Sequence, residues 1–455
     1  MERNEPGMLI IEHGRIVNEG KITEDAWIVT DGDKIAATGT GEVPESFRSR
    51  PHTAIDATGK TVMPGVIDEH VHFRDPGLTH KGDMATESAA AAAGGVTSFI
   101  DMPNTNPPTV SLEALEEKKK RAADVATANY GFFLGATNSN IDTLLRADYT
   151  EIAGVKLFLG SSTGNMLVDT QSTIERIFRE VDALIAVHAE DEATIAANRK
   201  ALVERYGREL PIAAHPVIRD HAACFTATKR AVEMAQETGA RLHVMHISTS
   251  DELRLFKPGP VSEKRITCET CPQYLIFTDE MYDALGARIK CNPAIKRPTD
   301  RDDILFALNH DIIDTIATDH APHLLSEKQG GALTAVSGMP GIQYALPVMM
   351  DMVREGLIKV ETLVQKMCHA PAELLGIERR GFIREGYYAD LVIFDTDCEP
   401  YEITDSSTIG RCGWTPYAGL QLNGKVEMTI LNGETVYRHG VVFGNVKGRA
   451  LRFGH

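Results

Sequence analysis

Two histidines stand one residue apart at the end of an apolar, β-rich run, in the segment His70-Val71-His72. Because side chains alternate along a strand, both imidazoles face the same side. Adjacent imidazoles suit zinc or a similar borderline metal, which prefers nitrogen ligands. Arg74 follows with the same parity and could offer its guanidinium to a carboxylate. An isolated His-x-His is more often a pair of hydrogen-bonded histidines, so its interpretation depends on the rest of the chain.

Other apolar runs also end in, or contain, polar side chains that stand out from their surroundings. These residues are Lys156, His188, His246 and Asp319. Lys156 lies inside an apolar strand pattern, where a bare ammonium would be costly unless it is paired or modified. Four histidines, one aspartate and one buried lysine are too many polar groups for a purely structural role. Taken together, they predict a metal site, and zinc, cobalt and manganese all accept this ligand set.

A repeated pattern of strands and helices can bring these residues together. Apolar strand patterns lie near 61–70, 95–102, 130–136, 153–159, 183–188, 240–247, 265–270 and 313–319, and helical patterns at 84–93, 111–123, 172–181 and 221–238 separate several of them. Eight strands in βα order predict a (β/α)8 TIM barrel. A doubly wound open sheet is the alternative, but barrel enzymes place their chemistry at the C-terminal strand ends, where these polar residues fall.

Both ends of the chain read as short strands separated by turns. Segments in 8–60 alternate with His-Gly and Asp-Gly turns, and the last strands include an Asn432-Gly433 hairpin signal. Neither end has enough strands for a core of its own, although two separate flaps are an alternative. We therefore predict one β-sandwich domain from residues 1–60 and 384–455, beside a catalytic barrel at 61–383.

Composition limits the kinds of partner. The 455 residues carry a formal charge of −17, which argues against binding nucleic acid or an anionic membrane. An anionic substrate would therefore need locally placed cations. No apolar stretch is long enough to span a membrane, and residues 1–6 lack a signal-peptide core. Seven scattered cysteines, an odd number, predict reduced thiols and a cytoplasmic protein.

The metal-ligand pattern resembles that of the amidohydrolase superfamily, and the run at 381–392 is similar to its C-terminal sandwich signature. In the cyclic amidase branch, the resemblance implies that Lys156 is carbamylated and bridges two zinc ions. It also implies a bridging hydroxide between the metals. Asp319 would bind one metal and also carry the proton from the hydroxide to the leaving ring nitrogen. The implied ligands are His70, His72 and Asp319 for the first metal, and His188 and His246 for the second.

Within this branch the motifs resemble the dihydroorotase family. The relevant segments are 70–77, 101–109, 291–296, 319–323 and 337–343. The resemblance implies that the substrate is held by Arg74, Asn104, Asn292 and His323. It implies reversible interconversion of N-carbamoyl-L-aspartate and L-dihydroorotate in pyrimidine biosynthesis. A homodimer and association with aspartate transcarbamoylase are also expectations from the family.

Two alternatives remain open at this stage. The stretch 269–275 is closer to hydantoinase and allantoinase usage, so the chain could be another cyclic amidase, a dihydropyrimidinase (hydantoinase) or an allantoinase. A catalytically inactive structural homologue is the second alternative, but all six ligand positions are filled. His243 has the opposite parity to His246 and is expected to point away from the site. The loop 160–170, which begins Gly160-Ser161-Ser162-Thr163-Gly164-Asn165, is a candidate lid.

Overall fold

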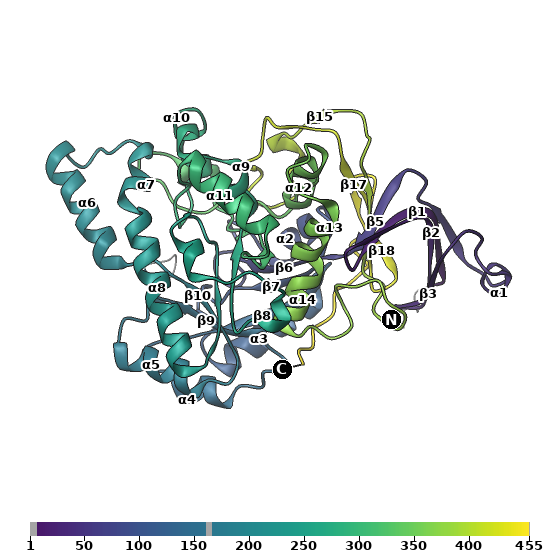
Figure 1. The fold of residues 1–455 in the computed structure, drawn as a ribbon, viewed down its shortest axis with the longest axis horizontal. Coiled ribbons are helices and arrows are strands. Elements are labelled where there is room, and N and C mark those ends of the chain that lie inside the picture. The colour runs from purple at the N-terminus through teal and green to yellow at the C-terminus, as the bar shows by residue number, and fades with distance from the viewer. Residues whose placement is uncertain (1–6, 161–165, 455) are drawn as a thin grey trace.

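The computed structural model describes residues 7–160 and 166–454 (Figure 1). Residues 161–165 of the predicted lid, and the segment 1–6, lie outside the described residues. Within the described part, no helix has both the length and the apolar character that crossing a bilayer requires.

Eight parallel strands form the central sheet, in the order β13-β12-β11-β10-β9-β8-β7-β6. The strands are β6 (Val66–Val71), β7 (Val96–Asp101), β8 (Asn129–Gly135), β9 (Gly154–Phe158), β10 (Leu184–His188), β11 (Arg241–Val244), β12 (Ile266–Thr270) and β13 (Thr315–Ile316). The two edges meet where the His72 amide donates to the His320 carbonyl (2.7 Å). The predicted TIM barrel is confirmed.

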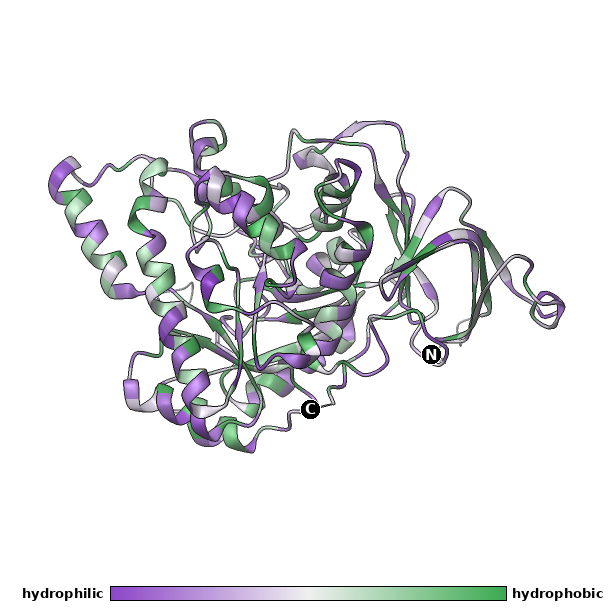
Figure 2. Ribbon diagram, viewed as in Figure 1, coloured by the Kyte–Doolittle hydropathy of each residue, from purple (hydrophilic) through white to green (hydrophobic). Residues whose placement is uncertain are grey.

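Helices surround the barrel and follow most of its strands (Figure 1). Their bounds are α2 (Met84–Ala93), α3 (Leu112–Val125), α4 (Ile141–Arg146), α5 (Gln171–Glu180), α6 (Glu192–Tyr206), α7 (His215–Ile218), α8 (His221–Thr238), α9 (Pro272–Ile276), α10 (Tyr282–Leu285), α11 (Pro298–Asn309), α12 (Ala345–Arg354), α13 (Val360–Val364) and α14 (Ala370–Leu375). The short α1 (Glu45–Arg48) lies outside the barrel, beyond the terminal sheet. Figure 2 shows hydrophobic and hydrophilic residues alternating along these helices, as expected where one face covers a core.

The predicted strand at 61–70 is two strands that belong to different sheets. β5 (Lys60–Pro64) pairs with the terminal strands, whereas β6 begins at Val66 and enters the barrel. Gly65 separates them, and its amide donates to the Asp390 carbonyl (2.8 Å). A Cβ at Gly65 would lie 2.0 Å from Thr97 Oγ1. The chain therefore passes from one sheet to the other at a position where only glycine fits.

The two ends of the chain form one nine-stranded sheet, in the order β19-β18-β17-β14-β5-β1-β2-β3, with β4 paired to β1. Its strands are β1 (Leu9–Asn18), β2 (Lys21–Asp31), β3 (Lys34–Thr40), β4 (Thr53–Asp56), β5, β14 (Leu391–Asp395), β17 (Lys425–Leu431), β18 (Glu434–Arg438) and β19 (Val441–Val442), and a separate ribbon pairs β15 (Tyr401–Glu402) with β16 (Gln421–Leu422). The predicted Asn432-Gly433 hairpin joins β17 to β18, with positive φ at both residues. The exact division at residues 60 and 384 stays a prediction.

The barrel interior is filled by apolar side chains beneath the polar strand ends. Leu184 and Ala186 share the strand face of His188 and belong to a buried cluster that also contains Phe133. Phe453 from the end of the chain joins this cluster, and its ring lies 2.8 Å from where a Cβ on Gly131 would be. The barrel is therefore a packed scaffold, and its polar residues lie at one end.

Candidate active site

One pocket at the C-terminal ends of the barrel strands contains all six predicted metal ligands. It is lined by His70, His72, Lys156, Phe158, His188, His246, Asn292, Asp319, Ala321, Ser337 and Gly338. These residues come from β6, β9 and β10 and from the segments that follow β6, β11, β12 and β13. The barrel thus brings together predicted ligands that lie up to 249 positions apart, from His70 to Asp319, as the strand-end pattern predicts.

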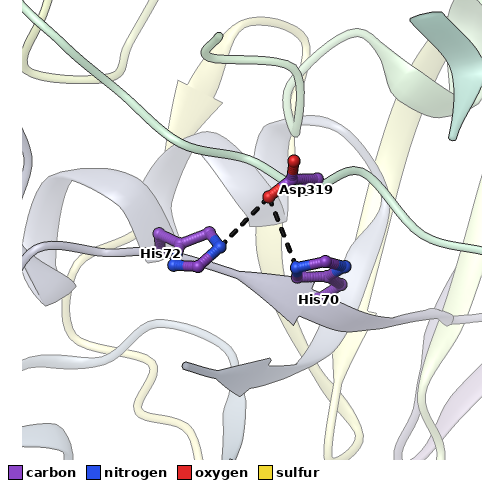
Figure 3. Close-up of side chains that lie close together, drawn as sticks. All are labelled: His70, His72 and Asp319. Carbon is purple, nitrogen blue, oxygen red and sulfur yellow. Dashed lines mark ion pairs between the residues drawn. The ribbon is translucent and has the colours of Figure 1, made fainter. Parts of the chain in front are cut away.

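His70, His72 and Asp319 form the tightest group in this pocket (Figure 3). Asp319 Oδ1 lies 3.3 Å from His70 Nε2 and 3.1 Å from His72 Nε2. One possible ligand atom from each residue lies within 4.8 Å of the others. Burial lowers the pKa of both histidines, which favours the neutral imidazole that binds metals. Two nitrogens and one carboxylate oxygen form a donor set that zinc accepts.

The other ring nitrogen of each histidine is held by a buried acceptor. Glu269 accepts from His70 Nδ1, and Asn104 Oδ1 accepts from His72 Nδ1 at 2.6 Å. These contacts place the ring proton on Nδ1 and leave the Nε2 lone pairs facing Asp319. Such partners orient metal-binding imidazoles and raise their basicity. The local geometry therefore fits a divalent cation.

The second predicted pair, His188 and His246, lies beside the first group, with the His246 ring centre 5.4 Å from that of His70. His188 Nδ1 is 2.8 Å from His246 Nε2, and His188 Nε2 is 3.1 Å from Glu190 Oε2. Glu190 is paired in turn with Arg219. Within the described part of the chain, the buried His246 Nδ1 has no hydrogen-bond partner. A buried ring nitrogen without a partner is what a missing ligand bond would leave.

Lys156 is fully buried between these two groups. Its ammonium contacts Met245 Sδ and lies 5.1 Å from the centre of the Phe158 ring. Burial lowers the pKa of Lys156 to about 8, although Glu269 and Asp319 oppose this shift. A substantial neutral fraction at physiological pH makes this amine a nucleophile as well as a cation. The side chain therefore suits covalent modification better than a permanent buried charge.

The backbone at the strand ends adopts unusual conformations. Arg74, His246 and Asp319 all have positive φ, at 65°, 45° and 48°. Each such residue costs of order 1–2 kcal/mol relative to an ordinary conformation. In β6, the pairing with β7 gains one residue between Asp68 and Val71, which is a β-bulge around His70. The bulge and the left-handed residues together turn side chains from three segments into one pocket.

The four predicted substrate residues occupy different places. Asn292 lines the pocket, and its buried Oδ1 has no hydrogen-bond partner among the described residues. Arg74 is buried, with Nη2 3.0 Å from His323 Nε2 and Nε donating to Pro322 O. Burial lowers the pKa of Arg74 to about 10, so it remains a cation at neutral pH. Asn104 contacts His72 instead of facing the pocket with its oxygen.

Several residues around the site were not predicted from the sequence. Glu269 is the most important, because it contacts His70 and also accepts from the His246 amide at 3.2 Å. Its position near the end of a buried strand was a usable signal. His243 was expected to point away; it does not line the pocket but is buried 3.5 Å from Glu269 Oε2. His320 is also buried, with Nε2 2.8 Å from Glu87.

Comparison with known proteins places this site in a family. The profile of the Amidohydrolase family matches residues 61–436. The chain belongs to the amidohydrolase family. It is a hydrolase, and its His70–His72–Asp319 group is a candidate metal site of the kind that this family uses.

Individual relatives carry three different activity names. The chain is 34% identical to a dihydroorotase of Halobacterium salinarum, over 93% of this chain and 95% of the relative. It is also 34% identical to an allantoinase of Streptomyces avermitilis, over 97% and 98%. A solved L-hydantoinase (dihydropyrimidinase) from Arthrobacter aurescens superposes with a TM-score of 0.88 at 30% identity, covering 96% and 97%. Overall similarity therefore does not separate these activities.

Proposed function

We propose that this amidohydrolase is a dihydroorotase, which reversibly hydrolyses the cyclic amide of L-dihydroorotate to N-carbamoyl-L-aspartate. The observation that carries the proposal is Arg74, a buried guanidinium paired with His323 beside the candidate metal pocket. A buried cation needs an anionic partner, and a guanidinium matches a carboxylate in shape. In a chain of net charge −17, this placement supports a substrate that carries a carboxylate.

We further propose two zinc ions per chain, with His70, His72 and Asp319 at the first and His188 and His246 at the second. Carbamylated Lys156 would bridge them. This arrangement is supported by the burial of Lys156, by its lowered pKa and by His246 Nδ1, which has no hydrogen-bond partner among the residues that the structure describes. When bound, the two cations would acidify a shared water and polarise the amide carbonyl.

The protein's own residues would complete the reaction. Asp319 is well placed to accept the proton of the attacking water and return it to the leaving ring nitrogen. Burial raises the pKa of the Asp319 carboxyl, against the lowering effect of His70. Arg74, His323 and Asn292 would hold the substrate, and Asn104 would bind it or position His72.

A different cyclic amidase is the second candidate. The whole-chain match to the solved L-hydantoinase and the hydantoinase-like stretch 269–275 favour it. An inactive homologue is less well supported, because all six ligand positions are filled and line one pocket.

The seven cysteines are all free, which supports a cytoplasmic location. The homodimer and the association with aspartate transcarbamoylase rest on the sequence resemblance alone.

Ring opening by the purified protein tests this function. L-dihydroorotate, dihydrouracil, hydantoin and allantoin would be compared at equal concentration, with bound metal quantified. We expect dihydroorotate to be preferred, with about two metals per chain. Preference for an uncharged ring would support the hydantoinase alternative, and bound metal without turnover would support the inactive homologue.

An Arg74→Met variant tests the role of the cation. We expect kcat/KM for dihydroorotate to fall at least about thirtyfold, because a buried charge pair is lost. Turnover of dihydrouracil should change less. Arg176→Met, which removes an exposed arginine paired with Glu180, is the matched control. If Arg74→Met retained its metals and full activity on dihydroorotate, the substrate assignment would be wrong.

A further inference from the structure

A second cation, Lys81, contacts His323 on the side away from Arg74. Lys81, in the segment that follows β6, has its Nζ 3.0 Å from His323 Nδ1. The same ammonium is paired with Glu327 at 3.0 Å. His323 is therefore flanked on both ring nitrogens, by Lys81 on one side and by Arg74 Nη2 at 3.0 Å on the other.

The two cations cannot both hydrogen-bond to a neutral imidazole. Lysine and arginine only donate, whereas a neutral ring has one N–H and one acceptor nitrogen. Burial, followed by the charges of Arg74 and Lys81, holds the pKa of His323 well below its usual range, so the ring is neutral. One ring nitrogen of His323 must therefore accept a hydrogen bond from the cation beside it. The other ring nitrogen must carry the proton, which then faces the N–H group of the other cation.

The surroundings decide which nitrogen accepts. A proton on Nδ1 would face the Lys81 ammonium, and the nearest carboxylate oxygen, on Glu327, is 3.6 Å away, too far for a hydrogen bond. Nε2 lies on the edge of the ring that approaches Gly338, a residue of the pocket lining, 3.0 Å from where a Cβ on that glycine would be. A proton on Nε2 therefore lies on the side of the ring nearest the pocket lining. Arg74 has further N–H groups that can bind the same ligand.

We propose that Lys81 is a positioning residue that holds His323 in the Nε2–H tautomer, so that His323 and Arg74 donate to one carboxylate of the substrate. This inference rests on the proposed function and deepens it. A carboxylate that accepts from both Arg74 Nη2 and His323 Nε2 satisfies both donors. Without an anion, these two N–H groups face each other. The three residues select for a carboxylate, and Lys81 acts without touching the substrate.

Lys81→Met tests this role, with Lys81→Arg as the conservative variant and Lys200→Met as the matched control. Lys200 is an exposed lysine on α6 that is paired with Glu204 and does not line the pocket. We expect Lys81→Met to raise KM for dihydroorotate about tenfold with kcat changed less than about twofold, because one charge-assisted contact is weakened. Lys81→Arg should recover most of the loss. Unchanged KM, or an equal fall in kcat, would overturn the proposal.

A double-mutant cycle with His323→Asn separates action through His323 from direct contact with substrate. Asparagine has no tautomers, so Lys81→Met should add less than about twofold to the KM of His323→Asn. A full tenfold addition would mean that Lys81 acts directly, which contradicts the proposal. If Lys81→Met does not fold, Glu327→Gln replaces it, because it weakens the anchor of Lys81.

Binding of orotate, measured by calorimetry, distinguishes failure of this inference from failure of the proposed function. Orotate carries the carboxylate but is not a substrate for ring opening. Tight orotate binding that weakens about tenfold in Lys81→Met supports the anion site even if dihydroorotate is not hydrolysed. Orotate binding that is equal in wild type and Lys81→Met contradicts it, whatever the catalytic activity.

Discussion

Glu269→Gln removes one charge beneath the candidate metal site while keeping the shape of the side chain. Glu269 accepts from His70 Nδ1, and it is fully buried. Although burial opposes ionisation, His70 and His243 hold the pKa of Glu269 well below its usual range. Glu269 is therefore a carboxylate at neutral pH, and its charge makes His70 a more basic ligand. A glutamine oxygen can still accept from Nδ1, so the ring orientation survives.

The expected loss follows from the change in hydrogen-bond type. A hydrogen bond to a charged group contributes about 1.5–3 kcal/mol and a neutral one about 0.5–1.5 kcal/mol. The difference of roughly 1–1.5 kcal/mol corresponds to about a tenfold loss of metal affinity. Substitution of such outer partners typically costs between about tenfold and a hundredfold. We therefore expect zinc affinity to fall within that range, with the fold retained.

Competition with a chromophoric chelator measures this affinity on apoprotein reloaded with zinc. Glu252→Gln is the matched control, because Glu252 is equally buried but bonds to Thr228 and Thr249 instead of a predicted ligand. Zinc affinity equal to wild type in Glu269→Gln would refute the reasoning. So would an equal loss in both variants, because it would show a general effect of replacing a buried glutamate.

Three further substitutions test the proposed bridging role of Lys156, the effect of Glu190 on stability in acid, and the packing of Phe453 in the barrel interior. Lys156→Met should reduce bound metal from about two per chain to about one and abolish ring opening, as measured by metal analysis and turnover. Although burial opposes ionisation, Arg219 lowers the pKa of Glu190 from 4.5 to about 2. This carboxylate therefore stabilises the fold by about 3 kcal/mol above pH 4.5, and the contribution is lost as the pH falls towards 2. Thermal unfolding of Glu190→Gln should therefore depend less on pH in that window. Phe453→Ala should cost about 3–5 kcal/mol in chemical unfolding, because its ring fills the barrel interior.

The barrel could be predicted from the sequence because its strands are buried on both faces and read as short apolar runs. The division of 61–70 into β5 and β6 could not be predicted in the same way. Both halves are apolar, and only the pairing of β5 with β14 shows that they belong to different sheets. Pro64-Gly65 marks the boundary between the two strands. From the sequence, however, this pair is equally consistent with a turn before a single strand.

The candidate ligands could be found because each one ends or interrupts an apolar strand, which is a local property. Glu269, Lys81 and Glu190 were missed because their roles depend on partners that are distant in the sequence, such as His70 for Glu269, 199 positions away. The contact between Asn104 and His72 was missed for the same reason. Strand register and β-bulges decide which buried side chains pair across a barrel. The spacing of residues in a single sequence does not reveal either of them.

In the proposed function, the metal ligands and the residues that select the substrate occupy neighbouring positions in the fold. The candidate metal ligands lie at or just beyond strand ends, where the barrel backbone positions them. Arg74, Lys81 and His323 lie further along the segments after β6 and β13 that also carry His72 and Asp319. Loops can change without disturbing the barrel, so relatives with different activity names can match this chain equally well over its whole length. Under the proposed function, discrimination between a charged and an uncharged ring would depend on a few loop residues, and substitutions at Arg74 and Lys81 should change that preference while the bound metals remain.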